Sequence, residues 1–178
     1  MIIMINGAFG TGKSTVAEKL HTMLPGSMIY DPEQVGYMLR EIIPSAIQLS
    51  HEQTGDFQDM DMWRLLVVQV AASLRQQYHR HLIVPMTLYS QDNFQWIQQG
   101  FTEMDPHTYH FCLLASKSVI HQRLRERGEV EGNWCFQQTN RCLEAYDAGG
   151  FEEYIQTDRM SILDIAHYIQ SRITIPNE

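Results

Sequence analysis

A glycine-rich segment near the start of the sequence carries the residues best suited to chemistry on a phosphate. Residues 7–14, Gly-Ala-Phe-Gly-Thr-Gly-Lys-Ser, match the spacing G-x-x-x-x-G-K-[ST] at every fixed position. The glycines let a loop turn its backbone N–H groups inward, and the helix expected behind it adds partial positive charge. Lys13 would reach the β- and γ-phosphates of a nucleotide, and the Ser14 hydroxyl would ligate Mg²⁺. The predicted phosphate site consists of Gly7, Ala8, Phe9, Gly10, Thr11, Gly12, Lys13, Ser14 and Thr15.

Two carboxylates, Asp31 and Glu33, follow a short apolar segment and form a second candidate group. Asp at the N-cap, Pro32 at the first helical position and Glu in the first turn also describe an ordinary helix start. Yet the carboxyl end of a strand is the edge where ligands bind in an open α/β sheet. There the two side chains would contact the substrate, hold Mg²⁺ and accept a proton from a hydroxyl. Asp31 is the better candidate for the base and Mg²⁺ ligand, with Glu33 second as base.

Two arginines spaced four residues apart, Arg123 and Arg127, suggest an anion site later in the chain. Like charges at this spacing share a helix face and repel each other unless an anion lies between them. The alternative is that they favour the negative end of the helix dipole just before Gly128. We expect contact with the nucleotide or its phosphates.

Three further residues are candidates for substrate contact. Trp63 and Arg64 are adjacent, and a large ring beside a charge can grip a polar ring system. The alternative is a core tryptophan beside a surface arginine. Arg40, on the helix expected at 32–43, fits a salt bridge as well as substrate contact.

The elements that would position these residues alternate between strand and helix. Residues 1–5 form an apolar run without alternation, which is typical of a central strand buried on both faces. Further strands are expected at 27–30, 81–87 and 109–115, with a short fifth strand within 151–157. Helices are expected at 15–24, 32–43, 56–78, 91–99, 116–128 and 134–146, with a last one opening at the 161–164 capping box. Ser90 and Ser116 are expected to cap helices, and residues 129–133 to form a hinge.

Composition restricts the function classes. The 178 residues carry a net charge of -8, which argues against nucleic acid or an anionic membrane surface as the main partner. Three cysteines indicate a reducing compartment and are expected to be core or half-buried. No segment has the length of a signal peptide's apolar region or a transmembrane span. We expect a cytoplasmic protein with one nucleotide-binding domain spanning residues 1–178.

Six segments together resemble a known family: INGAFGTGK (5–13), YDPE (30–33), LIVPMT (82–87), ASK (115–117), RLRER (123–127) and IQTD (155–158). The first is typical of the P-loop small-molecule kinases, and the combination is similar to bacterial tunicamycin-resistance proteins, from residue 1 to about 166. The resemblance implies a three-layer α/β fold with a five-stranded parallel sheet flanked by helices, and a helical lid at about 123–146. The chain ends short of the family's carboxyl-terminal extension, so peripheral membrane contact has no support in the sequence.

The resemblance also implies ATP and Mg²⁺ as cofactors and resistance to an acylated nucleoside antibiotic that contains uridine. Arg123 would then stack on adenine and Arg127 would meet phosphate. Arg141 would close on the transferring group, joining Lys13 and the carboxylates in catalysis. P-loop proteins usually place an acidic residue after the third strand, where this sequence has Pro-Met-Thr at 85–87. This difference moves the metal contact toward Asp31 or water.

The leading hypothesis is phosphoryl transfer from Mg·ATP to a hydroxyl of a small molecule, tunicamycin or a relative. The alternative is ATP-dependent binding that sequesters the drug without changing it, which the missing acidic residue favours. A GTPase switch is disfavoured because no N-K-x-D motif is present. A dinucleotide-binding dehydrogenase is disfavoured because the glycines are spaced G-x-x-G-x-G.

Overall fold

Strand β1 (Ile2–Gly7) lies at the centre of a five-stranded sheet and is buried along its whole length. Its side chains alternate between two hydrophobic cores, with Ile2 and Met4 in one and Ile3 and Ile5 in the other. A strand with apolar residues on both faces must be covered on both sides, because successive side chains point in opposite directions. The structure, a computed structural model, describes residues 1–151 and 153–174.

The sheet is parallel throughout, in the order β2-β3-β1-β4-β5. The other strands are β2 (Ser27–Ile29), β3 (His81–Pro85), β4 (Thr108–Leu114) and β5 (Tyr154–Gln156). In register, Ile3 pairs with Ile83 on one side and with Tyr109 on the other. The predicted α/β fold with five parallel strands is confirmed. Part of the segment expected to contain the fifth strand, residue 152, lies outside the described residues.

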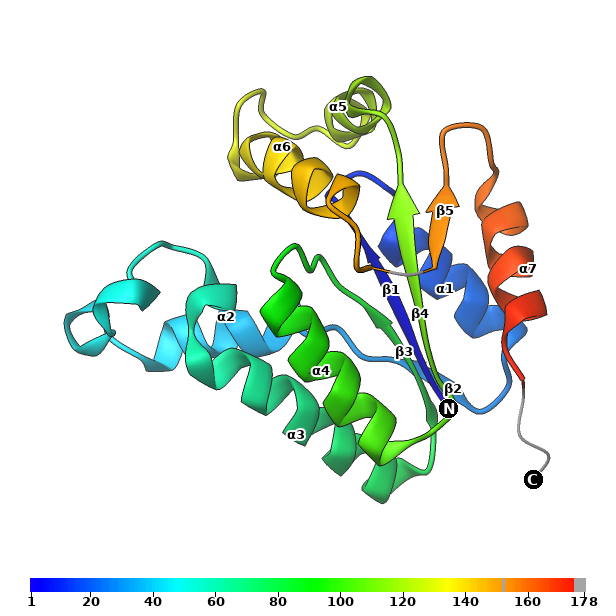
Figure 1. Ribbon diagram of the computed structural model, residues 1–178, viewed down its shortest axis with the longest axis horizontal. Coiled ribbons are helices and arrows are strands. Elements are labelled where there is room, and N and C mark those ends of the chain that lie inside the picture. The colour runs from blue at the N-terminus through cyan, green and yellow to red at the C-terminus, as the bar shows by residue number, and fades with distance from the viewer. Residues whose placement is uncertain (152, 175–178) are drawn as a thin grey trace.

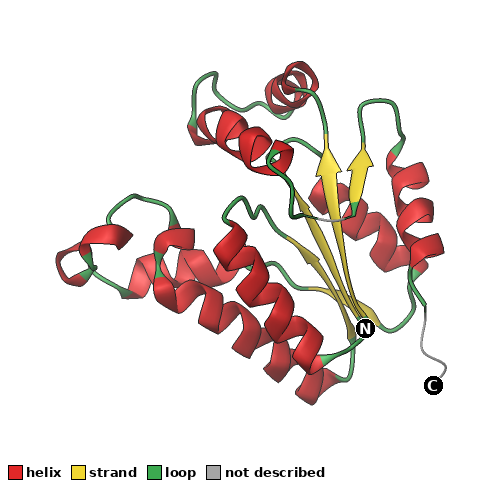
Figure 2. Cartoon of the chain, viewed as in Figure 1, coloured by secondary structure: helices red, strands yellow, loops and turns green. Residues whose placement is uncertain are grey.

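Helices cover both faces of the sheet (Figures 1 and 2). One face carries α1 (Lys13–Met23) and α7 (Ile162–Arg172), whose buried side chains share a core with Ile3 and Ile5. The other carries α2 (Glu33–Ile42), α3 (Asp61–Tyr78) and α4 (Gln91–Met104). Helices α5 (Lys117–Glu126) and α6 (Trp134–Asp147) lie above the carboxyl ends of the strands, in yellow-green and gold in Figure 1. The three expected layers are therefore present.

Two of the three serine helix caps predicted from local sequence patterns are confirmed, and one is not. Ser90 accepts a hydrogen bond from Asn93 N at 3.3 Å, and the Ser161–Asp164 capping box forms in both directions, as predicted. The cap expected from the Ser116 side chain is wrong. Its hydroxyl instead contacts the Ser118 hydroxyl at 3.2 Å, so it does not bond to the helix backbone.

The helix expected at 56–78 begins at Asp61, because the residues just before it adopt a different conformation. Asp56 accepts a hydrogen bond from Gln58 N at 3.0 Å and caps a separate 3-10 turn, Phe57–Asp59. Two further 3-10 turns, Ser45–Ile47 and Ser50–Glu52, lie between α2 and the Phe57–Asp59 turn. Within the described residues, no helix combines the length and apolar character needed to span a membrane.

Candidate active site

The loop between β1 and α1 has a backbone that requires glycine. Gly10 and Gly12 have φ of 84° and 95°, in the left-handed region that L side chains rarely adopt. A Cβ on Gly7 would lie 2.6 Å from the Leu113 carbonyl oxygen and 2.7 Å from Thr11 Oγ1. The loop therefore packs closely against β4 on one side and leaves its other side to a ligand. The sequence pattern and the backbone agree on a phosphate cradle.

Lys13 begins α1 with an unusual environment for a cation. The side chain is only 8% exposed, and its Nζ donates to the Ala8 carbonyl oxygen at 3.0 Å. Burial lowers the pKa of Lys13, and the Glu33 carboxylate partly opposes that shift. A buried ammonium group with few anionic partners is stabilised by a phosphate, so this environment fits a nucleotide.

A cavity of about 670 Å³ opens in front of this loop. It gathers most of the predicted site: Phe9, Gly10, Gly12, Lys13, Ser14, Thr15, Asp31, Glu33, Arg123 and Arg127 all line it. Gly7, Ala8 and Thr11 do not line the cavity; they shape the loop from behind, where Thr11 Oγ1 donates to Ala8 O at 2.8 Å. Segments separated by more than 100 residues thus meet at the carboxyl edge of the sheet.

A second cavity of about 340 Å³ adjoins the first. The two share four lining residues: Phe9, Glu33, Tyr37 and Cys135. The remaining wall of the second cavity contains Arg40, Gly55, Asp56, Phe57, Gln58, Tyr89, Trp134 and Gln138. It is therefore lined by aromatic and amide side chains from the residues before α3, from the segment after β3 and from α6.

The two carboxylates have different surroundings. Asp31 lines only the first cavity, and its oxygens accept from Glu33 N at 2.9 Å and Gln34 Nε2 at 3.2 Å. The Asp31 carboxylate therefore accepts the N–H of the first residue of α2, but the predicted position of the cap is wrong by one residue, because Pro32 and not Asp31 directly precedes the helix. Glu33 lines both cavities and accepts a weak hydrogen bond from the Tyr37 hydroxyl at 3.4 Å. Burial raises the pKa of Glu33; the charge of Lys13 opposes this shift and that of Asp31 reinforces it.

The residues expected to hold Mg²⁺ fit that ion in chemistry. Ser14 and Asp31 both line the first cavity and supply one hydroxyl and one carboxylate. Mg²⁺ beside a nucleotide commonly takes one or two protein oxygens together with phosphate oxygens and water. At the end of β3, Pro85 lines the cavity in place of an acidic residue. Across residues 1–151 and 153–174, no cluster of three acidic, histidine or cysteine side chains could form a metal site by itself.

Three predicted arginines lie in different places. Arg123 lines the first cavity and donates to the Thr157 carbonyl oxygen at 3.1 Å, while Arg127 lines it and pairs with Glu129 at 2.6 Å. Arg141 lines neither cavity: its guanidinium lies 4.2 Å from the centre of the Tyr89 ring. The expectation that Arg141 reaches the transferring group is not supported by its position here.

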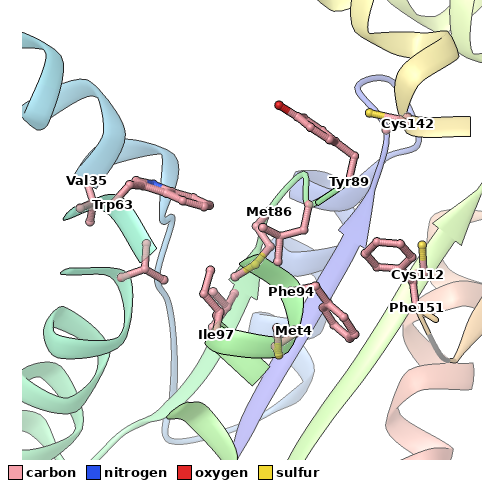
Figure 3. Packing of buried hydrophobic residues seen from close by; sticks show 14 of the residues in the cluster. Met4, Val35, Trp63, Met86, Tyr89, Phe94, Ile97, Cys112, Cys142 and Phe151 are labelled. Atoms are coloured by element: carbon pink, nitrogen blue, oxygen red, sulfur yellow. The ribbon is translucent and has the colours of Figure 1, made fainter. Parts of the chain in front are cut away.

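The substrate contact predicted for Trp63 is wrong. The side chain is 1% exposed, its indole N–H donates to the Pro32 carbonyl oxygen at 3.1 Å, and Figure 3 shows it beside Val35 in the core. Arg64 lies over the Trp96 ring at 5.2 Å and lines neither of the two adjoining cavities, so its contact with a substrate stays a prediction. Arg40 does line the second cavity, where it donates to the Gly55 carbonyl oxygen and lies over Phe57.

Asn6 is a site residue that the sequence reading missed. It is fully buried, and its Oδ1 accepts from Gly7 N at 2.7 Å, Leu88 N at 2.8 Å and the Tyr146 hydroxyl at 3.3 Å. Its Nδ2 donates to Leu88 O at 3.0 Å. One side chain therefore ties the phosphate loop to the segment after β3 and to α6. The available signal was an amide directly after five apolar residues.

Fold and site together define a nucleotide-binding P-loop protein with a kinase-like fold. The family model described as AAA domain matches residues 2–147, so the chain belongs to this family.

Among solved structures, the tunicamycin resistance protein of Deinococcus radiodurans is similar at 27% identity, with 99% of each chain covered and a TM-score of 0.76. The resemblance predicted from the sequence motifs is confirmed. Shikimate kinase from Acinetobacter baumannii is 14% identical, covering 96% of this chain and 90% of its own, with a TM-score of 0.61. A gluconokinase from Sinorhizobium meliloti is 19% identical, covering 96% and 97%, with a TM-score of 0.59. These two show the fold alone. Comparison with curated protein sequences gives no match.

Proposed function

We propose that the protein transfers the γ-phosphoryl group of Mg·ATP to a hydroxyl of a small molecule, with tunicamycin or a related nucleoside antibiotic as acceptor. The observation that carries this proposal is the position of Glu33 where the two cavities adjoin. On one side lies the phosphate loop, and on the other a wall of aromatic and amide groups. A carboxylate at that boundary can face a hydroxyl held in the second cavity and a phosphate held in the first.

The reaction would proceed as follows. The acceptor hydroxyl gives its proton to the Glu33 carboxylate while its oxygen forms a bond to the γ-phosphorus, and the bond to the β,γ-bridging oxygen breaks to release ADP. Lys13 would stabilise the charge on the β- and γ-phosphates. Ser14 and Asp31 would hold Mg²⁺, which offsets phosphate charge when bound. We assign the base to Glu33 in preference to Asp31, since Glu33 lines both cavities whereas Asp31 lines only the first and is assigned to Mg²⁺.

Helices α5 and α6, with the segment between them, would act as the lid, and Arg127 would meet the transferring phosphoryl group. A transition-state arginine is worth about 10³–10⁵ in rate, so Arg127→Ala should lower kcat at least a hundredfold. Arg125→Ala is the matched control, because Arg125 lies in the last turn of α5, two residues before Arg127, pairs with Glu131 at 2.7 Å and lines neither cavity. A loss below tenfold in Arg127→Ala would remove this residue from the mechanism.

The experiment that tests the proposal is incubation of the purified protein with Mg·ATP and excess tunicamycin, followed by mass spectrometry of the drug. A product heavier by one phosphate, formed in many-fold excess over the protein and absent with Lys13→Ala, is the expected result. Unmodified drug after prolonged incubation with active ATP-binding protein contradicts it. Binding of ATP, measured separately by calorimetry, shows that the protein used is competent.

A second candidate function is ATP-dependent sequestration of the drug. Pro85 stands in the first cavity where a metal-binding carboxylate is common, which favours binding over turnover. Sequestration predicts stoichiometric retention of unchanged drug only when ATP is present. Turnover far above one drug molecule per protein rules it out.

A further inference from the structure

Two glutamines that line the second cavity carry buried amide oxygens without hydrogen-bond partners. Gln58 and Gln138 both line it, and their side chains are 8% and 9% exposed. In the described part of the chain, neither Oε1 atom has a partner. A buried polar atom that stays unpaired costs stability, so such atoms are rare in folded proteins and call for an explanation.

The orientation of the Gln58 amide follows from its neighbours. Its Nε2 donates to the Thr87 carbonyl oxygen at 2.9 Å, a partner that only the nitrogen can satisfy. The backbone of Gln58 is fixed as well, because its carbonyl oxygen accepts from Asn93 Nδ2 at 2.8 Å. Gln58 Oε1 is therefore an acceptor held in place by the fold.

The two glutamines belong to different parts of the molecule. Gln58 lies in the 3-10 turn before α3, which packs with the core, whereas Gln138 is on α6, above the carboxyl ends of the strands. A ligand with two donor groups would satisfy both oxygens and connect these parts. Ring-shaped ligands would also meet the aromatic side chains of Phe57 and Trp134 in the same wall.

The charges of this cavity favour an uncharged ligand. It is lined by two carboxylates, Glu33 and Asp56, and Asp56 accepts from the Tyr89 hydroxyl and from Gln58 N. Arg40 is the sole cation among its lining residues, and its guanidinium is engaged by Gly55 O and the Phe57 ring. An acceptor with a carboxylate would place a third negative charge in this space at a cost.

We propose that Gln58 and Gln138 are specificity-determining residues of the acceptor site: their amide oxygens take two hydroxyl or N–H donors of an uncharged, ring-containing acceptor, which thereby bridges α6 and the 3-10 turn before α3. This rests on the proposed function and names the residues that select its acceptor. ATP would bind without either glutamine, since neither lines the first cavity.

The test has two readouts. In calorimetry with a non-hydrolysable ATP analogue present, tunicamycin should bind the wild-type protein, while shikimate and gluconate, which carry carboxylates, should not. Gln58→Leu and Gln138→Leu should each weaken tunicamycin binding about tenfold or more and leave the affinity for the ATP analogue unchanged. Gln137→Leu is the matched control, because Gln137 is an exposed neighbour on α6 that lines neither cavity.

The second readout is the stability of the ligand-free protein. Gln138→Leu removes an unpaired buried acceptor at similar volume, so the melting temperature should rise by about 2 °C or more. A residue with a purely structural role would give a lower melting temperature. A fall in melting temperature, no binding of tunicamycin to the wild type, or unchanged affinity in both leucine variants overturns the proposal.

These results separate the assignment from the reaction. Binding that needs both glutamines, with no phosphorylated product, keeps the assignment and refutes phosphoryl transfer. Phosphorylation of tunicamycin with unchanged affinity in both variants refutes the assignment and keeps phosphoryl transfer.

Discussion

Gly36 offers a direct test of how α2 is packed, by the substitution Gly36→Ala. A Cβ at this position would lie 2.3 Å from Phe57 Cγ and 2.6 Å from both Cδ atoms, far inside normal contact. The ring cannot easily give way, because it packs on Trp63 at 5.4 Å, on Tyr37 at 5.8 Å and under the Arg40 guanidinium at 5.1 Å. Either the helix or the ring must move, and both form part of the second cavity.

The magnitude follows from two opposing effects. Alanine is better than glycine inside a helix by about 1 kcal/mol. Overpacking a buried site costs about 1–3 kcal/mol, and weakening the aromatic contacts of Phe57 adds roughly 0.5–1.5 kcal/mol. The clash should therefore win, leaving the variant less stable by roughly 2 kcal/mol. For a chain of this size that corresponds to a melting temperature lower by about 4–8 °C.

Thermal and urea unfolding of Gly36→Ala would be compared with Glu41→Ala, an exposed position on the same helix that should change stability by less than about 0.5 kcal/mol. In the double variant Gly36→Ala/Phe57→Leu, the smaller side chain should make the combined loss smaller than the two single losses taken together. A higher melting temperature for Gly36→Ala would refute the reasoning, because it would mean that helix propensity outweighs the packing. Since Phe57 lines the second cavity, acceptor binding should weaken while ATP binding persists.

Three further predictions concern buried polar groups. Asn6→Ala should lower the free energy of unfolding by roughly 2–4 kcal/mol in urea titrations, because it leaves the Leu88 N–H and C=O and other groups without partners; a loss below 1 kcal/mol would contradict this. Glu33→Gln should lower kcat by about 10²–10⁴. The wild-type rate should rise with pH through the Glu33 pKa, which burial raises above 4.5, because the base acts when it is deprotonated. A rate that does not fall as the medium is acidified, together with an active Gln variant, would argue for another base. Burial alone would raise the pKa of Asp105, but hydrogen bonds, chiefly from the Met1 amino group, lower it below 3.8. Asp105 should thus stabilise the fold above its unfolded-state pKa and lose that effect as the pH falls toward its folded-state pKa. Asp105→Asn should flatten this decrease in the free energy of unfolding at acid pH. An unchanged pH profile of stability would show that the pair of Met1 and Asp105 contributes nothing.

Short-range patterns were enough to identify the framework and one end of the site. The phosphate loop depends on glycines that only a left-handed backbone explains, and on a lysine at a fixed distance from them, so its chemistry is contained in eight consecutive residues. β1 was recognisable because five apolar residues without alternation can only be buried on both sides. The cap at Ser90 and the box at Ser161 are equally local, and both form.

Only the tertiary structure decided which residues line the second cavity. Residues 44–55 have no regular period, and the conformation of the residues just after them depends on distant partners: Tyr89 donates to Asp56, and Gln58 donates to Thr87. With that turn held apart, α3 begins at Asp61 and Trp63 points into the core, so the tryptophan that looked suited to a substrate is structural. Gln58 and Gln138 carry no local signal, since a glutamine that lines a cavity and one on the surface look the same in sequence. That both line the same cavity depends on how α6 lies over the sheet. This placement is set by side-chain packing between segments about 80 residues apart.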